Sequence, residues 1–147
     1  MERTMNDVGY LINKAARLTK WELNNRLGDV GLTSPQFAVL REIFCSESKG
    51  DKKADLTPAT IAERVYADRP TISGIIQRLT DQGWVQRVEN PNDRRSKIIV
   101  LTDKSIALMG TLDSLSSETM KKGLKDFSEE EIADLRKYLL KVINNFV

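Results

Sequence analysis

Apolar residues recur along most of this chain at the spacing of amphipathic helices. Between about Asn6 and Leu27 they lie three or four positions apart, on one helix face: Val8, Leu11, Ile12, Ala15 and Leu18. Gly28 interrupts that pattern, and Ser34 followed by Pro35 is typical of an N-cap and a first helical residue. A second helix is expected from there, with an apolar face made of Phe37, Leu40, Ile43 and Phe44.

Two short helices joined by a tight turn are expected next, at residues 57–82. Thr57 and Pro58 have the residue types of an N-cap and a first helical residue. The second helix covers the segment from Arg69 to Gln82, and its apolar residues follow the spacing i, i+3, i+4, i+7: Ile72, Ile75, Ile76 and Leu79. Gly83 supplies a left-handed C-terminal stop. Together the two helices form a helix-turn-helix pattern.

The segment that follows has the pattern of a β-hairpin. Trp84 to Glu89 alternate in polarity, Asn90 to Asp93 are rich in turn residues, and Lys97 to Leu101 are mostly β-branched. Arg94 and Arg95 then occupy the tip of the hairpin. A hairpin directly after a helix-turn-helix is a wing, so we expect one at residues 84–101.

Two further helices are expected in the C-terminal part of the chain. The first begins at Thr102 and Asp103 and runs to near Lys122. The second begins with a capping box formed by Ser128 and Glu131. Its apolar residues form a near-heptad seam: Ile132, Leu135, Leu139, Val142, Ile143 and Phe146. Since no long linker separates these elements, the sequence predicts one domain over residues 1–147.

Composition excludes several classes of function. The 147 residues contain no histidine and one cysteine, so neither a Ser-His or Cys-His pair nor a four-ligand Cys/His zinc site can be built within the chain. We therefore expect no enzyme activity, no metal and no cofactor. The net charge of +2 is too small to indicate nucleic acid by itself, so the positions of the basic residues must carry that argument.

Three further features of the sequence indicate where in the cell the protein is expected. No stretch approaches the roughly 18–20 unbroken apolar residues of a membrane span. The segment from Met1 to Asp7 lacks the basic start and apolar run of a secretory signal. One cysteine also excludes an intramolecular disulfide, so a reducing cytoplasm is the expected compartment. Because no apolar stretch is long enough to span a membrane, no membrane partner is expected.

Two features receive no functional assignment. Cys45 is near the end of the second helix, and we expect a buried or idle thiol there rather than a redox sensor. Residues 46–55 are polar and charged without periodicity, which predicts an exposed loop. Its lysines are expected to be solvated rather than bound to DNA.

The order of these elements and several short motifs resemble the MarR family of transcription regulators over essentially the whole chain. The family's wing signature, Asp-x-Arg followed by Leu-Thr, is matched by Asp93, Arg95 and the pair Leu101-Thr102. The other matching segments are Leu32 to Phe37, Ile61 to Arg64, Asp81 to Val85 and Asn90 to Lys97. Each fragment alone is a weak signal, and their order and spacing make the resemblance strong.

The resemblance implies a mainly α (α+β) fold, a winged helix-turn-helix with N- and C-terminal dimerisation helices. Residues of about 1–30 and 103–147 would pair with a second copy, and residues of about 31–102 would contact DNA. It also implies that a small aromatic effector can bind between the two parts. Candidate residues for that site are Tyr10, Trp21, Phe37 and Arg41, although aromatic residues on helices more often pack in a core.

The face of the Arg69–Gln82 helix opposite its isoleucines is the expected major-groove surface. Its candidate residues are Arg69, Pro70, Thr71, Ser73, Gly74, Gln77 and Arg78. Those near the N-terminus are best placed for base edges or phosphates, Gln77 can pair with adenine, and Arg78 suits a phosphate. Many relatives carry a long polar residue where Gly74 stands, so the glycine either permits close backbone approach or shifts recognition to its neighbours. The alternative is a solvated helix face, which the adjoining wing disfavours.

At the wing, Arg95 is the strongest candidate for DNA contact. A guanidinium at a hairpin tip can enter a narrow A·T-rich minor groove, where the negative potential is enhanced. Asp93 would repel phosphate, so we expect it to hold Arg95 by a charge-assisted hydrogen bond. Arg94 and Lys97 are expected to add contacts to the DNA backbone. The alternative is an ordinary solvated turn.

These observations predict a sequence-specific, DNA-binding transcription regulator. We expect a homodimeric repressor on double-stranded DNA, bound to a pseudo-palindromic operator and released by an effector. The alternative is a winged-helix protein-interaction module that uses the Ile132–Phe146 seam and binds no DNA. The operator sequence, the effector, the regulated genes and the sign of regulation are left open by the sequence.

Overall fold

A computed structural model describes residues 2–48 and 56–147 of the chain. These residues form a mainly helical fold with one two-stranded antiparallel sheet, which confirms the expected fold class. In chain order the elements are α1 (Glu2–Leu27), the 3-10 helix η1 (Gly28–Val30), α2 (Ser34–Ser48), α3 (Pro58–Arg64), α4 (Arg69–Asp81), β1 (Val85–Glu89), β2 (Lys97–Leu101), α5 (Asp103–Gly123) and α6 (Glu129–Asn144).

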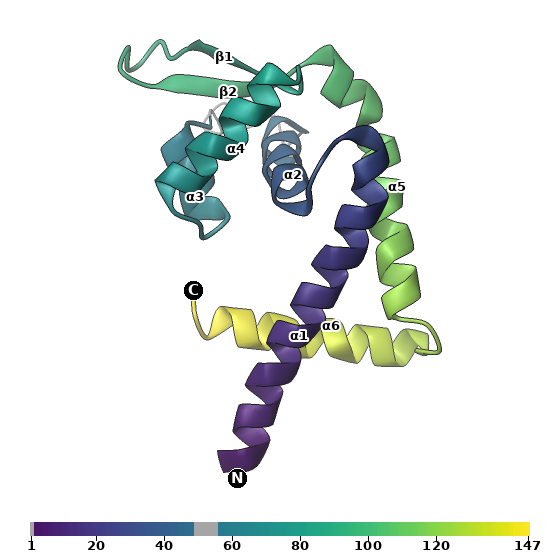
Figure 1. Cartoon of the computed structure of the whole chain (residues 1–147). Coiled ribbons are helices and arrows are strands. Elements are labelled where there is room, and N and C mark those ends of the chain that lie inside the picture. Colours follow the sequence, from purple (N-terminus) through teal and green to yellow (C-terminus); the bar gives the residue numbers. More distant parts are fainter. Residues whose placement is uncertain (1, 49–55) are drawn as a thin grey trace.

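The elements divide into a head and a stem. In Figure 1, α2, α3, α4 and the β1–β2 hairpin form the head, while α1 and α5 run side by side away from it. The last helix, α6, starts at the end of α5 that is farther from the head, and in this view it crosses α1. We use "head" for residues 31–102 and "stem" for α1, α5 and α6. Figure 1 shows the arrangement of these helices, and the roles expected for the two parts stay predictions.

The head has a continuous apolar core to which each of its elements contributes. The stripe predicted on α4, residues Ile72, Ile75, Ile76 and Leu79, is entirely buried. It packs in one cluster with buried residues of α1, α2, α3, both strands and α5, among them Leu27, Leu40, Ile61, Trp84, Ile99 and Leu112. Burial of that stripe fixes the rotation of α4 about its own axis, and hence which of its residues face outward.

Capping residues define where α3 and α4 begin and end. The Thr57 hydroxyl accepts the backbone N–H of Thr60, as the sequence predicts for the start of α3. Asp68 caps α4 in the same way. At the end of α4, Gly83 has φ +78°, the left-handed conformation predicted for the helix stop. The helix-turn-helix therefore has its expected limits to within one residue.

The second helix differs from the prediction at both ends. Its N-cap is Thr33 rather than Ser34, because the Thr33 hydroxyl accepts the N–H of Gln36 and the Gln36 side chain accepts the N–H of Thr33. At its other end the helix continues to Ser48, and the expected loop start was wrong. Ser46 is buried and accepts a hydrogen bond from Arg64 at 2.7 Å. The rest of the predicted loop, residues 49–55, lies outside the described residues.

The hairpin is joined to the rest of the head by backbone hydrogen bonds. Its two strands pair from Val85 opposite Leu101 to Glu89 opposite Lys97. The backbone N–H of Ile99 donates to the Leu56 carbonyl at 2.8 Å, immediately before α3. These contacts confirm the predicted wing and hold it against the helix-turn-helix.

The base of the wing is also held by the first turn of α5. The Thr102 hydroxyl donates to the Gly83 carbonyl at 2.7 Å, and the Ser105 hydroxyl donates to the Trp84 carbonyl. The Lys104 ammonium donates to the Gln82 carbonyl at 3.0 Å and lies 4.3 Å from the centre of the Trp84 ring. The turn between α4 and β1 is therefore fixed to the start of α5.

The stem leaves many large apolar side chains exposed. On α1 these include Val8, Leu11, Ile12, Leu18 and Trp21. The predicted capping box of α6, Ser128 with Glu131, is present, yet α6 buries none of its residues. Its exposed apolar residues include Ile132, Leu139, Val142 and Ile143, and Phe146 just beyond its end is exposed as well. None of the helices in the described ranges is long and apolar enough to cross a membrane.

Candidate nucleic-acid interface

The outer face of α4 carries every residue that the sequence nominates for the major groove. All seven are exposed: Arg69, Pro70, Thr71, Ser73, Gly74, Gln77 and Arg78. The buried isoleucine stripe on the opposite side explains this exposure, since the helix cannot rotate without exposing that stripe to water. The helix therefore presents a polar surface with two arginines to solvent.

The first turn of this helix is fixed by Asp68. One carboxylate oxygen accepts the backbone N–H of Thr71 at 2.8 Å, and the other accepts the Thr71 hydroxyl, also at 2.8 Å. Because these hydrogen bonds stabilise the ionised form, the pKa of Asp68 is lowered below its ordinary value of 3.8. This role of Asp68 was not predicted from the sequence. An aspartate directly before an Arg-Pro helix start was the available signal.

A short hydrogen-bonded chain joins the outer face of α4 to the wing. An Nη atom of Arg87 on β1 donates to Gln77 Oε1 at 3.1 Å, and Gln77 Nε2 donates to Asp81 Oδ1 at 2.9 Å. All three side chains are exposed. Arg87 was missed by the sequence analysis. Strand alternation was the available signal, because it places Arg87 on the same face of the hairpin as Val85, which packs against the core.

At the tip of the wing, Asp93 organises the backbone around Arg95. An Asp93 carboxylate oxygen accepts the backbone N–H of Arg95 at 2.9 Å. Asn90 contributes further, with its side-chain oxygen accepting the N–H of Asn92 and its amide donating to Ser96. The predicted Asp93–Arg95 hydrogen bond is thus made through the backbone amide.

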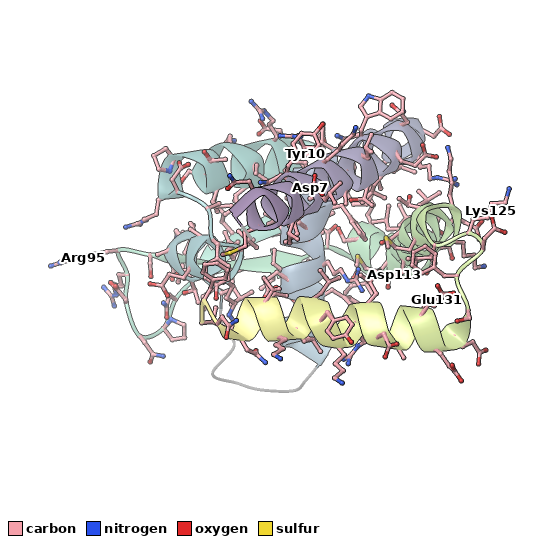
Figure 2. The ribbon with its side chains drawn as sticks, turned by 90° about the horizontal axis from the view of Figure 1, so that it is seen from below. Asp7, Tyr10, Arg95, Asp113, Lys125 and Glu131 are labelled. Carbon is pink, nitrogen blue, oxygen red and sulfur yellow. The ribbon has the colours of Figure 1, made fainter. Side chains whose placement is uncertain are left out.

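The Arg95 guanidinium itself projects away from the body of the molecule. Figure 2 shows it at one end of the structure, with Lys125 at the opposite end. None of the ion pairs found among the described residues involves Arg95. Asp93, Arg94 and Lys97 are exposed beside it. The wing therefore carries three cationic side chains near its tip.

A groove of about 400 Å³ lies between the start of α2 and the outer face of α4. Its lining residues are Thr33, Pro35, Gln36, Pro70, Thr71, Gly74, Ile75 and Arg78. A Cβ atom built on Gly74 would meet no other atom within 4 Å. Packing within the chain therefore does not require glycine at this position.

The four candidate effector residues do not form one site. Phe37 and Arg41 line a cavity of about 510 Å³, whose walls also include Lys20, Tyr66, Thr71, Ile72, Ile75 and Ser116. Trp21 lines a different cavity, of about 360 Å³, between α1 and the end of α5. Tyr10 lines neither cavity and is exposed on α1. The first cavity is lined by residues of the stem and by residues of α4.

Cys45 is exposed on α2, so the expected alternative of a buried thiol is wrong. Within the described residues, no cluster of histidine, cysteine, aspartate and glutamate side chains is suited to hold a metal ion.

The chain is similar to known proteins over most of its length. The sequence pattern of the MarR family matches residues 32–97. The multiple antibiotic resistance protein MarR of Escherichia coli is 30% identical over 137 residues, covering 92% of this chain and 90% of that protein. The HTH-type transcriptional regulator PecS of Dickeya dadantii is 30% identical over 146 residues, covering 98% of this chain and 80% of PecS.

Solved structures give the same result. A mutant E. coli MarR complexed with operator DNA has a TM-score of 0.81 and 28% identity, with 95% of each chain covered. A MarR transcriptional regulator from Methanosarcina mazei, 21% identical, has a TM-score of 0.85 over 95% of this chain and 96% of its own, and supports the fold alone. Since similarity of sequence extends over nine-tenths of the chain, the protein belongs to the MarR family of regulators.

Proposed function

We propose that this protein is a sequence-specific transcription regulator that binds double-stranded operator DNA as a homodimer. The observation that carries this proposal is the joining of two cationic, exposed surfaces into one unit: the outer face of α4 and the wing, linked by the Arg87–Gln77 hydrogen bond. The relative PecS is named as an HTH-type transcriptional regulator, so we propose regulation rather than catalysis as the activity of this protein. We also propose a cytoplasmic location, because a regulator of this kind acts where the DNA is.

In this proposal α4 enters the major groove. Residues near its N-terminus, Arg69, Thr71 and Ser73, would lie closest to base edges, as in other helix-turn-helix proteins. Arg78, one to two turns further along, would contact a phosphate. Pro70 and Gly74 carry no donors on their side chains, so their part would be to allow the backbone close to the duplex.

The wing would occupy the neighbouring minor groove. Arg95 would enter that groove, while Asp93 holds the backbone of the tip in shape and Arg94 and Lys97 face the phosphates. The similarity to an E. coli MarR structure complexed with operator DNA supports this orientation of the head toward the duplex. Arg95 would then recognise the shape of the minor groove, in addition to the major-groove contacts made by α4.

The stem would supply the dimer. The helix α6 buries none of its own residues and exposes Leu139, Val142 and Ile143, so it needs an apolar partner surface. A second copy of the chain provides a surface of the same chemistry. Two heads related by a two-fold axis would then meet successive major grooves about 10 bp apart, which requires a pseudo-palindromic operator. Occupation of such a site within a promoter would repress transcription.

An effector would act through the 510 Å³ cavity. Its volume is in the range of small-molecule sites, and its walls combine apolar side chains with the cations Lys20 and Arg41. Phe37 offers an aromatic surface on the same wall, which suits a small aromatic ligand. Because Thr71 and Ile75 of α4 also line this cavity, a bound ligand that favours one position of α4 over another would change DNA affinity.

The proposal is tested by selecting bound sites from random duplex DNA and titrating the selected operator with wild type and with Arg95→Ala. We expect a pseudo-palindromic site, a steep loss of affinity with added salt, and at least about tenfold weaker binding by Arg95→Ala with dimerisation intact. A wild-type protein that is monomeric and binds no duplex at low ionic strength would contradict the proposal. That result would favour the protein-interaction alternative, in which the α6 seam binds another protein.

A further inference from the structure

Arg87 occupies the junction between the two proposed DNA-binding elements. Its strand, β1, follows α4 after a three-residue turn, and across the hairpin it pairs with Ile99 of β2. From that strand its guanidinium reaches the exposed face of α4 and donates to Gln77 Oε1 at 3.1 Å. The junction therefore carries a positive charge between the helix and the wing.

This charge is not neutralised within the described part of the chain, where none of the ion pairs involves Arg87. A guanidinium has five N–H donors, and the hydrogen bond to Gln77 uses one of them. The remaining donors suit the bidentate geometry in which arginine binds phosphate oxygens. Arg87 is thus exposed, oriented and still able to bind an anion.

Gln77 orients this arginine. Its amide oxygen accepts from Arg87, and its amide nitrogen donates to Asp81 Oδ1 at 2.9 Å. Pairing with adenine would need the same oxygen and nitrogen, so base contact by Gln77 would compete with both of these hydrogen bonds. The observed geometry favours a positioning role for Gln77 over direct base contact.

A duplex docked on the head would bring a phosphate to Arg87. When α4 lies in a major groove and the wing lies in the adjacent minor groove, one sugar-phosphate strand must pass between them, because that strand is the boundary of the two grooves. The junction of α4 and β1 is the part of the protein that faces this strand. We propose that Arg87 binds a phosphate of this strand and that Gln77 positions it, an inference that rests on the proposed DNA binding.

The inference is tested with Arg87→Ala and, as a second variant that keeps a hydrogen-bonding side chain, Arg87→Gln. Each is titrated with the selected operator and with an unrelated duplex at several salt concentrations. We expect both duplexes to lose affinity by a similar factor, about three- to tenfold, and the slope of log K against log salt to fall by about one. Lys125→Ala removes the same charge at the opposite end of the molecule and should leave both affinities unchanged.

Gln77→Ala separates positioning from base contact. If Gln77 positions Arg87, its loss weakens both duplexes, and the double variant Arg87→Ala/Gln77→Ala binds no more weakly than Arg87→Ala alone. Loss of affinity only for the operator, through one base pair, would contradict the positioning role. If wild type binds DNA and Arg95→Ala weakens it while both Arg87 variants keep the wild-type salt slope, the inference fails and the proposed function stands. If wild type binds no duplex, the proposed function itself fails.

Discussion

The head and the stem use the same helical periodicity with opposite results. In α4, each apolar residue of the stripe is buried within the chain. In α6, an apolar stripe with the same spacing is exposed at most of its positions, from Ile132 at 38% to Ile143 at 52%, with Leu135 half-buried between them. Amphipathic patterning therefore identifies a face that must be buried, and leaves open whether the chain itself or another molecule buries it.

This difference indicates which part of the molecule is stabilised by burial within the chain and which part needs a second molecule. The head is built around a buried core, to which α1 and α5 also contribute, and exposes a polar surface that suits a polar partner. The stem exposes an apolar surface, whose burial requires a second molecule with the same kind of surface. The most direct ways to test this contrast are substitutions that act on only one of the two regions.

The largest effect is expected from a charge placed in the α6 seam. Ile143→Glu would put an unpaired carboxylate into the proposed dimer interface. Because burial of an unpaired charge is strongly unfavourable, the protein should become monomeric. Since each head alone would then bind a half-site without the gain from a linked second head, operator affinity should fall by about a hundredfold or more. Light scattering measures the oligomeric state, and an operator titration measures the affinity.

Lys137→Glu, on the polar face of the same helix, is the control and should leave the dimer intact. Equal behaviour of the two variants would contradict a dimer formed by the seam.

Shortening a buried side chain in the head should lower the free energy of unfolding instead. Leu79→Ala removes a fully buried side chain and should destabilise the protein by about 2–5 kcal/mol, measured by chemical denaturation. Leu139→Ala, on α6, should show a loss that depends on protein concentration, because it weakens association. The contrast would be broken if the Leu139 variant lost the same stability at every concentration.

A smaller effect is expected from acidification of the α4 cap. Because the folded-state pKa of Asp68 is lowered, its contribution to stability is fully present above its ordinary value of 3.8 and is lost as the pH falls through the lowered value. Asp68→Asn keeps an oxygen for the Thr71 N–H but cannot titrate, so its stability should decline less than that of wild type between about pH 5 and pH 2. Urea unfolding across this range measures the difference. Coincident pH curves for wild type and Asp68→Asn would contradict this role of Asp68.

The smallest effect on stability is expected at Gly74. Alanine there meets no atom within 4 Å and should stabilise the exposed helix by about 1 kcal/mol. Operator affinity should nevertheless fall, by less than for Arg95→Ala, if the glycine allows the backbone close to DNA. Gly110→Ala, equally open within α5, is the matched control and should stabilise without affecting affinity. Unchanged binding by the Gly74 variant would show that recognition depends on its neighbours.

Local periodicity and capping were sufficient to predict the helices, the wing and the exposed face of α4. The error at the start of α2 arose because Thr33 and Ser34 are both good caps, and the choice is made by Gln36 three residues after Thr33. The extension of α2 through Ser46 could not be predicted locally, because the partner of Ser46 is Arg64 on another helix.

The sites depended more strongly on tertiary structure. The exposure of the major-groove candidates followed from the isoleucine stripe, whereas Arg87 becomes significant only when its contact with Gln77 is seen. The effector candidates show the same limit. Phe37 and Arg41 share a cavity, but Trp21 and Tyr10 lie elsewhere on α1, since helical spacing alone does not say which helices meet.

The hydrogen bonds from Thr102, Lys104 and Ser105 to the turn before β1 have a mechanical consequence. They fix the base of the hairpin to the first turn of α5, so we expect the hairpin and this turn to move as one rigid unit. A small tilt of α5 would then displace the arginine tip further than it displaces the base of the hairpin. Substitutions far down α5 should therefore alter the operator spacing that the protein prefers while leaving its choice of bases unchanged.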